Sequence, residues 1–217
     1  MQTGKKFVAS YSSGKDSTLA VYKAIQAGME PIGLIITYNT DAERIWFHGL
    51  SEEVIQRLSD SLEIPIRLIR TSGAEYEINF EKTLKEFKEA GADVCVFGDI
   101  DIEGHLEWGR QRCANTGLEA CYPLWQMNRK DAVLEFLNNG FTTRLIAVNT
   151  DKLGLEYLGE PLTLDLMHRM EEAGVDVCGE NGEYHTLVTG GPLFKKPFHF
   201  TLGEPDVTPP YAKLPVY

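Results

Sequence analysis

The chain has 217 residues, 43% of them hydrophobic and 24% charged, which is typical of a globular protein with a substantial buried core. Its formal net charge of −11, without any basic block, argues against general binding to nucleic acid backbones. No apolar run approaches the ~20 residues of a membrane span, and no apolar signal region follows the start, so a cytoplasmic protein is expected. Four cysteines without C-x-x-C spacing are expected to be reduced and buried: Cys95, Cys113, Cys121 and Cys178.

The first predicted elements are a buried strand over 7–11 and an amphipathic helix over 18–27. The turn between them, Ser12–Ser17, reads Ser-Ser-Gly-Lys-Asp-Ser. Unpaired backbone N–H groups and the positive end of the helix dipole face such a turn, while hydroxyls add donors and Lys15 adds a positive charge. The pattern predicts a phosphate site. An ordinary turn, in which a polar residue such as Asp16 caps the helix, is the alternative.

This loop is not a Walker A motif, which needs a glycine where Ala9 stands and a serine or threonine where Asp16 stands. It resembles instead the SGGxDS loop of the PP-loop ATP pyrophosphatases, with Ser13 replacing the first glycine. Members of that superfamily split ATP between its α and β phosphates, hold pyrophosphate in the loop and transfer AMP to a substrate oxygen. The resemblance implies a site for ATP and Mg²⁺ formed by Ser12, Ser13, Gly14, Lys15, Asp16 and Ser17.

The same resemblance implies distinct roles within the loop. Its small residues would hold the pyrophosphate portion of ATP. Lys15 is expected to be catalytic, because its charge would neutralise the charge that develops on the leaving pyrophosphate. Asp16 is the second catalytic candidate, as a residue that orients Mg²⁺, although it would also be expected there as a helix cap.

Strands and helices alternate through the next hundred residues. Strands are predicted over 32–37, 64–69 and 94–97, and helices over 50–62, over 80–91 and through Trp108 as far as Gly117. Alternation of this kind predicts βαβ units and therefore an α/β fold with a parallel sheet covered on both faces. The resemblance to the PP-loop ATP pyrophosphatases implies that this sheet is Rossmann-like and similar to that of the adenine nucleotide α-hydrolases.

Ligands of such sheets bind beyond the carboxyl ends of the strands. Three segments follow predicted strand ends: Ser12–Ser17, Tyr38-Asn39 and Gly98-Asp99. They are expected to share one rim and to form a single ATP-binding pocket. His48 lies between the second strand and the next helix and is a further candidate for ATP binding, with a local hydrogen bond at the helix entry as the alternative.

The later part of the chain predicts a smaller α+β lobe, with a helix over 128–140, a strand over 143–148 and a helix over 164–173. Four prolines are expected to leave the last fifteen residues poor in regular structure. We therefore expect an ATP-binding domain at 1–121 and a substrate-binding lobe at 122–217, with the active site between them.

A second polar cluster, residues 178–186, reads Cys-Gly-Glu-Asn-Gly-Glu-Tyr-His-Thr. Its glycines allow a tight turn close to a ligand. Glu183 is expected to be catalytic, and His185 would exchange protons near neutral pH. A solvated polar turn leading into a strand is the alternative. The predicted substrate-binding residues are Glu180, Asn181, Gly182, Glu183, His185 and Thr186.

Three blocks along the chain resemble the diphthine–ammonia ligase family, a branch of the ATP pyrophosphatases that makes an amide from a carboxylate. They are Ser12–Ser17, then Tyr122–Trp125 with the helix that follows, and Gly179–Thr186 leading to Gly190–Phe194. The resemblance implies that a substrate carboxylate attacks the α-phosphate of ATP, pyrophosphate leaves, and ammonia displaces AMP. The implied partners are ATP, ammonia and a carboxylate, either protein-borne diphthine or a small molecule, and the chain could form a homo-oligomer.

The third block departs from the pattern of the family members that amidate diphthine, which read Gly-Glu-Gly-Gly-Glu-x-Glu-Thr. Asn181 and His185 replace a glycine and a glutamate here. This chain is more similar to a bacterial branch linked to cobalamin or other small-molecule metabolism. Diphthine carries a trimethylammonium group that a glutamate would attract, so His185 points to a different carboxylate substrate.

Two functions of other classes fit part of the same pattern. A sensor would hold ATP or AMP without turnover, and pyrophosphate release distinguishes it from a ligase. A sulfur- or nitrogen-transferring enzyme that modifies tRNA would need catalytic cysteine pairs and a basic surface, and the sequence shows neither.

Overall fold

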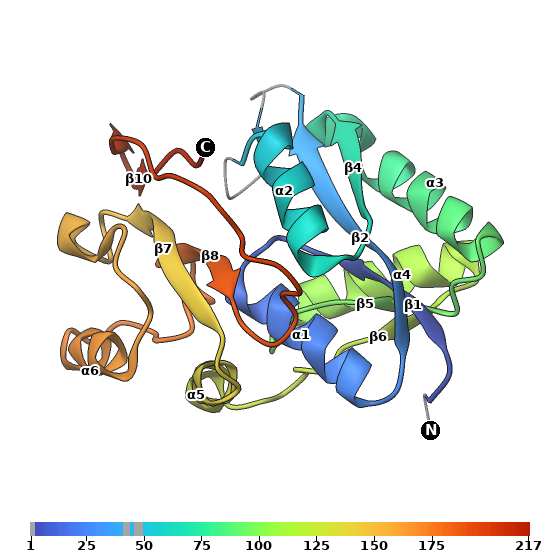
Figure 1. Ribbon diagram of the computed structural model, residues 1–217, viewed down its shortest axis with the longest axis horizontal. Helices are drawn as coiled ribbons and strands as arrows, with labels where there is room; N and C mark the ends of the chain where they lie inside the picture. The colour runs from blue at the N-terminus through green and yellow to red at the C-terminus, as the bar shows by residue number, and fades with distance from the viewer. Residues whose placement is uncertain (1–2, 41–43, 46–49) are drawn as a thin grey trace. The chain divides into compact units, whose positions relative to one another are not determined.

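The computed structural model describes residues 3–40, 44–45 and 50–217 (Figure 1). Its contacts divide the chain into two compact units. The first comprises the chain up to Ser12, the segment from Asp16 through the second and third strands, and Ile64–Met127. The second comprises Ser13–Lys15, the segment that holds the second helix, and Asn128–Tyr217. Two segments from the early part of the chain therefore group with its later part, and the boundary expected after residue 121 stays a prediction.

The first unit is built on a six-stranded sheet with the order β3–β2–β1–β5–β6, in which β4 also pairs with β2. The strands are β1 (Lys6–Ser10), β2 (Glu30–Asn39), β3 (Arg44–Ile45), β4 (Ile66–Thr71), β5 (Val94–Val96) and β6 (Glu119–Cys121). All pairings are parallel except that of β3 with the carboxyl end of β2. The predicted Rossmann-like sheet is thus confirmed, and β6 is a strand that the sequence pattern did not reveal.

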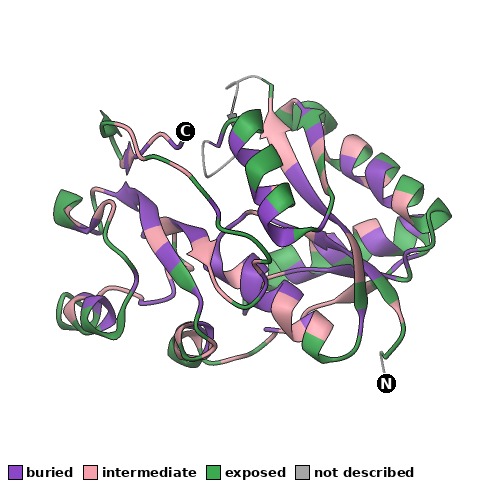
Figure 2. Ribbon diagram, in the orientation of Figure 1, coloured by how far each residue is buried: buried purple, intermediate pink, exposed green. Residues whose placement is uncertain are grey.

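Helices cover both faces of this sheet. They are α1 (Lys15–Gln26), α3 (Tyr76–Glu89) and α4 (Glu103–Thr116). The chain runs from β1 to β2 and β4, then returns to the other side of β1 for β5 and β6. Because such crossovers are right-handed, this reversal puts α1 and α4 on opposite faces. The middle residues of β1 and β2 and the whole of β5 are accordingly buried, whereas the ends of β1 and β2 are partly exposed (Figure 2).

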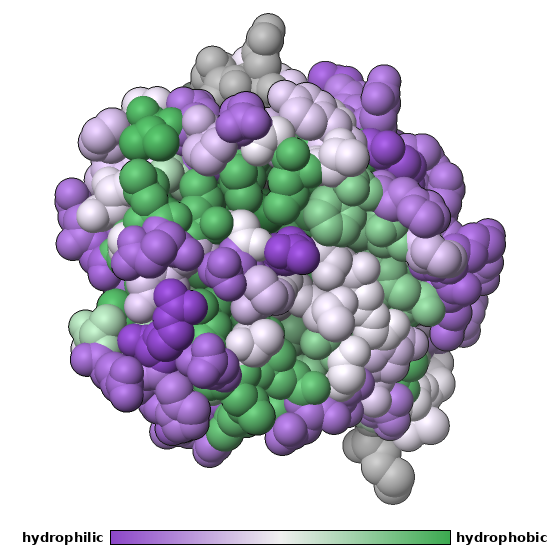
Figure 3. Space-filling view, turned by 60° about the vertical axis from the view of Figure 1, so that its left-hand side comes forward, coloured by the Kyte–Doolittle hydropathy of each residue, from purple (hydrophilic) through white to green (hydrophobic). Residues whose placement is uncertain are grey.

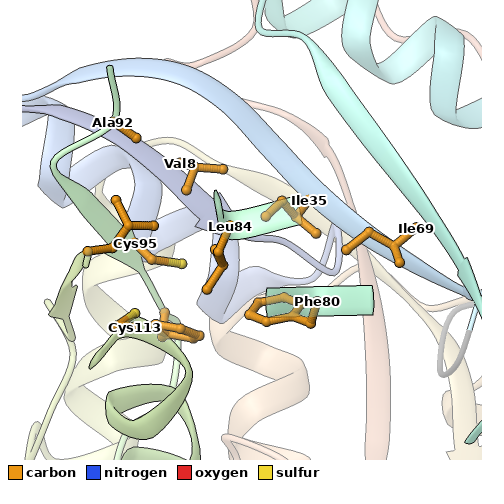
Figure 4. Close-up of a cluster of buried hydrophobic side chains, with 10 residues drawn as sticks. Val8, Ile35, Ile69, Phe80, Leu84, Ala92, Cys95 and Cys113 are labelled. Carbon is orange, nitrogen blue, oxygen red and sulfur yellow. The ribbon is translucent and has the colours of Figure 1, made fainter. Parts of the chain in front are cut away.

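One hydrophobic core lies between the sheet and the pair α3 and α4 (Figure 4). Val8, Ile35 and Cys95 contribute from three neighbouring strands, and each is at most 1% exposed. Phe80 and Leu84 cover them from α3, at spacing i and i+4 on one helix face. Trp108 packs against this core, with its ring centroid 5.1 Å from that of Phe80. This core fixes the strands whose carboxyl ends carry the predicted ATP site.

The second unit holds a four-stranded antiparallel sheet with the order β8–β7–β10–β9. Its elements are α2 (Glu52–Leu62), α5 (Arg129–Asn138), β7 (Thr142–Asn149), α6 (Leu164–Glu172), β8 (Tyr184–Gly190), β9 (Asp206–Thr208) and β10 (Tyr211–Lys213). The chain also forms two short 3-10 helices, Gly73–Glu75 in the first unit and Leu155–Tyr157 in the second.

The last fifteen residues correct a prediction, because they contain β9 and β10 rather than irregular chain. Pro209 and Pro210 form the turn between these two strands, and Pro205 and Pro215 lie outside them. Proline interrupts a strand only where its missing N–H is needed for pairing, and here no proline occupies such a position. The prolines therefore delimit the hairpin.

One face of this sheet is apolar. Val148 on β7 is paired with Ala212 on β10 and with Tyr184 on β8, and all three side chains are at most 3% exposed. Paired residues in antiparallel strands point to the same side, so these three form one row across the sheet.

Within the described part of the chain, no helix combines the length and the apolar character needed to cross a bilayer.

The cysteine prediction is confirmed for Cys95, Cys113 and Cys178, which are buried and carry free thiols. Cys121 is also a free thiol, but it is only partly buried, because it ends the edge strand β6.

Candidate functional site

The carboxyl edge of the parallel sheet has a switch point between β1 and β5. From these two neighbouring strands the chain leaves in opposite directions, which opens a crevice where α/β proteins bind their ligands. Gly98 follows β5 there, and a Cβ atom on it would lie 2.7 Å from the backbone nitrogen of Ser17 and 2.8 Å from its Cα. Only glycine therefore permits this close approach to the start of α1.

The predicted phosphate loop follows β1 and continues into α1, which begins at Lys15, three residues earlier than predicted. The backbone N–H of Ser12 donates to the hydroxyl of Ser17 at 3.2 Å, and their two hydroxyl oxygens are 3.0 Å apart. Because α1 begins at Lys15, Asp16 lies in the first turn of the helix, where the helix dipole stabilises a carboxylate.

Ser13 has a left-handed backbone conformation, with φ of 66°, and its side chain is completely buried. A residue other than glycine adopts this conformation at a cost of about 1–2 kcal/mol. The SGGxDS pattern has a glycine at this position, so the substitution keeps a backbone geometry that glycine adopts freely.

Ser13–Lys15 run along the outer edge of β8, which is the terminal strand of its sheet. The backbone N–H of Val188 donates to the carbonyl oxygen of Ser13 at 2.9 Å. The backbone N–H of Lys15 donates to Oγ1 of Thr186 at 3.1 Å. The tip of the loop and the predicted substrate-binding segment are thus held together within the second unit.

The side chain of Lys15 is 4% exposed and lies against the same segment. Its Nζ donates to the carbonyl oxygen of Cys178 and lies 5.4 Å from the centroid of the Tyr184 ring. The Tyr184 hydroxyl in turn donates to the carbonyl oxygen of Val177. A buried ammonium group needs such polar and aromatic neighbours, so these contacts fix where the charge of Lys15 lies.

Glu183 is 6% exposed and faces its own turn. Its Oε1 accepts from Nδ2 of Asn181 at 3.1 Å, and its Oε2 accepts from the backbone N–H of Asn181 at 3.0 Å. Gly179 and Gly182 have φ values of 75° and 80°, as expected for a tight turn. Glu183 therefore stabilises the turn, and its catalytic role stays a prediction.

An ion pair between Arg129 and Asp176 lies beside the turn that contains Asn181. Nη1 of Arg129 lies 2.5 Å from Oδ2 of Asp176 and 3.2 Å from Oδ1 of Asn181. The other oxygen of Asp176 accepts from the backbone N–H of Cys178 at 2.9 Å. Arg129 is the first residue of α5, and its neighbour Asn128 caps the helix by accepting from the backbone N–H groups of Lys130 and Asp131.

His185 corrects a second prediction. Its pKa falls to about 4 because the side chain is largely removed from water and because Lys15 and Lys213 both disfavour a further positive charge. The imidazole is thus neutral at pH 7. The expectation that His185 exchanges protons near neutral pH is therefore wrong. It still offers one N–H donor and one nitrogen acceptor.

The remaining predicted ATP-binding residues lie in the first unit. Tyr38 and Asn39 end β2, and the Tyr38 ring lies 5.3 Å below the guanidinium group of Arg70. Asp99 follows β5, and its Oδ1 is 3.0 Å from Nδ1 of His105. The structure brings these residues to the predicted sheet edge, where their contact with ATP stays a prediction. His48 lies outside the described residues.

Sequence reasoning missed three side chains around the 178–186 segment. Lys152 donates from Nζ to the carbonyl oxygen of Asn181. The Tyr211 hydroxyl lies beside Gly182, since a Cβ atom placed on Gly182 would be 3.6 Å from it. The positive charge of Lys213 lowers the pKa of His185. Strand alternation in Tyr-Ala-Lys was the available signal, but the surrounding prolines concealed it.

A pocket of about 350 Å³ also lies in the second unit, where the end of α5 meets β7 and the start of α6. Leu137, Phe141, Leu162 and Leu164 line it together with polar neighbours, and none of the predicted site residues does. Green areas of hydrophobic residues are visible on the face of the molecule shown in Figure 3. The pocket and the predicted site are therefore separate features.

Comparisons with known proteins agree with the resemblance seen in the sequence. The family model described as the diphthamide synthase N-terminal domain matches residues 5–120, and that of the diphthamide synthase C-terminal domain matches residues 128–205. The diphthine–ammonia ligase of Homo sapiens is 27% identical over 227 residues, and that of Bos taurus is 26% identical over 225. Both alignments cover 88% of this chain and 81% of the relative.

A solved structure described as a predicted subunit of tRNA methyltransferase from Methanocaldococcus jannaschii is also similar. It is 14% identical, with a TM-score of 0.48, over 88% of this chain and 98% of that chain. A likeness this distant does not bear on function.

Proposed function

Because the chain belongs to the diphthamide synthase family, we propose that it is an ATP-dependent ligase that forms an amide from a carboxylate and ammonia and releases AMP and pyrophosphate. One observation supports this proposal most strongly. The loop between β1 and α1 is hydrogen-bonded through Ser13 and Lys15 to Val188 and Thr186. A phosphate-binding turn and a polar acceptor segment are thus parts of one hydrogen-bonded assembly.

In the first step, a carboxylate oxygen of the substrate attacks the α-phosphorus of ATP, and the bond to the bridging oxygen of pyrophosphate breaks. The electron pair and the negative charge pass to pyrophosphate. The hydroxyls of Ser12 and Ser17 and the N–H groups at the start of α1 bind this leaving group, and the charge of Lys15 lowers its energy. Mg²⁺ bound with ATP would supply further charge neutralisation, and the carboxylate of Asp16 would offer the oxygen ligand that this ion prefers.

In the second step, ammonia attacks the carbonyl carbon of the acyl adenylate, AMP leaves with the electron pair of the broken C–O bond, and the nitrogen loses a proton. The turn held by Glu183 and Asn181 would shape the surface against which the acyl group lies. Gly182 and Glu180, which are both partly exposed, would face the substrate, and the buried Thr186 would support this surface through its hydrogen bond with Lys15.

Pyrophosphate release from Mg-ATP, ammonium and a panel of carboxylates tests the proposal. Lys15→Met should reduce the rate about a hundredfold, since removal of one charge-stabilising group costs about 3 kcal/mol in a dry site. Lys130→Met is the matched control, because Lys130 forms a surface ion pair with Glu171 on α6. An unchanged rate in the Lys15 variant, or failure of the wild-type protein to bind ATP in calorimetry, contradicts the proposal.

A further inference from the structure

The second face of the β8–β7–β10–β9 sheet carries polar residues in register. Lys213 on β10 is paired with Ala147 on β7, and Ala147 is paired with His185 on β8. Directly paired residues point to the same side, so Lys213 and His185 flank the small Ala147 on one face. Tyr211 and Asn149, which form the neighbouring pair, lie two residues away on their strands and point to that side as well. We call Asn149, His185, Tyr211 and Lys213 the polar face.

This arrangement gives the antiparallel sheet one apolar face and one polar face. The row on the opposite face consists of Val148, Ala212 and Tyr184, all buried. On the polar face, Asn149 is 9% exposed, and the other three side chains are partly exposed. Oδ1 of Asn149 accepts from the backbone N–H of Asp151 at 3.1 Å, and the donor groups of the three partly exposed side chains suit this face to a polar ligand.

The polar face adjoins the 178–186 segment. The Tyr211 hydroxyl lies beside Gly182, and Lys213 lies 5.7 Å from the Tyr211 ring centroid, measured from Nζ. Asp206 on β9 is paired with Lys213, and its Oδ1 accepts from the Thr208 hydroxyl at 3.2 Å. It is exposed at the outer edge of the sheet, whereas His185 lies on the other side of Lys213.

Burial lowers the pKa of His185, and the cationic side chains of Lys15 and Lys213 lower it further, so the imidazole is neutral at pH 7. A neutral imidazole donates through one N–H, and an ammonium group donates through up to three and carries a charge. Together with the Tyr211 hydroxyl they form a set of donors to which a carboxylate is complementary, and which repels a cation.

We propose that the polar face binds the carboxylate substrate of the ligase, that Lys213 is a specificity-determining residue, and that the substrate carries no positive charge near its reacting end. This inference rests on the proposed function, and it names the class of substrate. Lys213 would contact the anionic end of the substrate, and His185 would donate to it as a neutral group. A substrate with a quaternary ammonium group near that end is excluded.

Two carboxylates of the same shape test the inference. In 4-trimethylammoniobutanoate a positive nitrogen stands where 5,5-dimethylhexanoate has a carbon atom, so only the charge differs. Calorimetry with the full chain, with and without Mg-ATP, measures the affinity for each. We expect the wild-type protein to bind 5,5-dimethylhexanoate at least tenfold more tightly, and Lys213→Met to remove most of this preference. Lys213→Arg, which keeps the charge, should retain it.

Lys196→Met is the control, because Lys196 forms an exposed ion pair with Glu63 and is not on the polar face. It should leave both affinities unchanged. Equal binding of the two probes, no binding of either, or a preference that survives Lys213→Met in a variant with unchanged thermal unfolding overturns the inference. If the same calorimetry shows no ATP binding, the proposed function is overturned instead. In that case the affinities of the two probes measured without Mg-ATP still test the inference.

Discussion

The backbone N–H of Lys15 donates to Oγ1 of Thr186 at 3.1 Å, although 171 positions separate the two residues. A second bond, from Val188 to Ser13, runs beside it. The loop that would hold pyrophosphate therefore takes its shape partly from the edge of β8. Both ends of the chain contribute to one structural element, and substitutions in β8 should affect nucleotide binding.

Thr186→Val removes the acceptor for the Lys15 N–H while it preserves the shape of the side chain. We expect a loss of about 1–3 kcal/mol in the free energy of unfolding, because a buried donor is left without its partner. Weaker ATP binding should accompany it. Thr186→Ser keeps the hydroxyl and should behave almost as wild type. Urea unfolding and ATP calorimetry measure the two effects, and equal behaviour of Val and Ser would refute the role of the hydroxyl.

Gly98→Ala should disturb the start of α1. The added Cβ would lie 2.7 Å from the Ser17 nitrogen and 2.9 Å from the carbonyl carbon of Asp16, so the backbone must shift. A cost of about 1–3 kcal/mol in stability is expected, together with a clear loss of ATP affinity. Gly104→Ala is a fitting control, because nothing lies within 4 Å of its Cβ position. Unchanged ATP affinity in Gly98→Ala would show that this approach does not shape the site.

Glu183→Gln changes one atom of a side chain that accepts two hydrogen bonds from Asn181. Glutamine offers one acceptor oxygen and places an NH₂ group against a donor, so about 1–3 kcal/mol of stability should be lost. Turnover should fall as the turn loosens. Glu171→Gln, on the exposed side of α6, provides the comparison. If Glu183→Gln unfolds like wild type but has lost turnover, its role is chemical rather than structural.

Acid should destabilise the protein through His185. Its pKa is 6.5 in the unfolded chain and about 4 in the folded one, so the unfolded chain takes up a proton first as the pH falls. The stability that depends on the neutral imidazole is complete above pH 6.5 and is lost between about 6.5 and 4, by roughly 2–3 kcal/mol. His185→Gln should lack this component. Unfolding free energies measured every half unit from pH 7 to 4 decide the matter: parallel curves for the two proteins would disprove it.

Local patterns in the sequence were enough to predict the α/β unit. Residues such as Val8, Ile35 and Cys95 lie in short apolar runs, and the helices between them have apolar residues at helical spacing. The phosphate loop was recognisable because its small residues, lysine and helix start are contiguous. The family resemblance, which the comparisons confirm, extended this to the chain as a whole.

Features that depend on contacts between distant segments could not be predicted in this way. The neutral state of His185 results from burial and from Lys15 and Lys213, which are remote in sequence. The inward orientation of Glu183 depends on a turn whose hydrogen bonds are not encoded by composition. The frequency of proline predicts irregular chain at the C-terminal end, but the β9–β10 hairpin forms because each proline lies outside the paired strand positions.

The attachment of Ser13 and Lys15 to β8 has a consequence for biosynthesis. A ribosome releases the N-terminal segment long before residue 186 is synthesised, so the nascent chain could complete its sheet while the tip of the first loop still lacked its hydrogen-bonding partners. Competence to bind nucleotide would then arise late, when translation has almost finished. A prematurely terminated product would be inert toward ATP even if most of its tertiary structure had already formed.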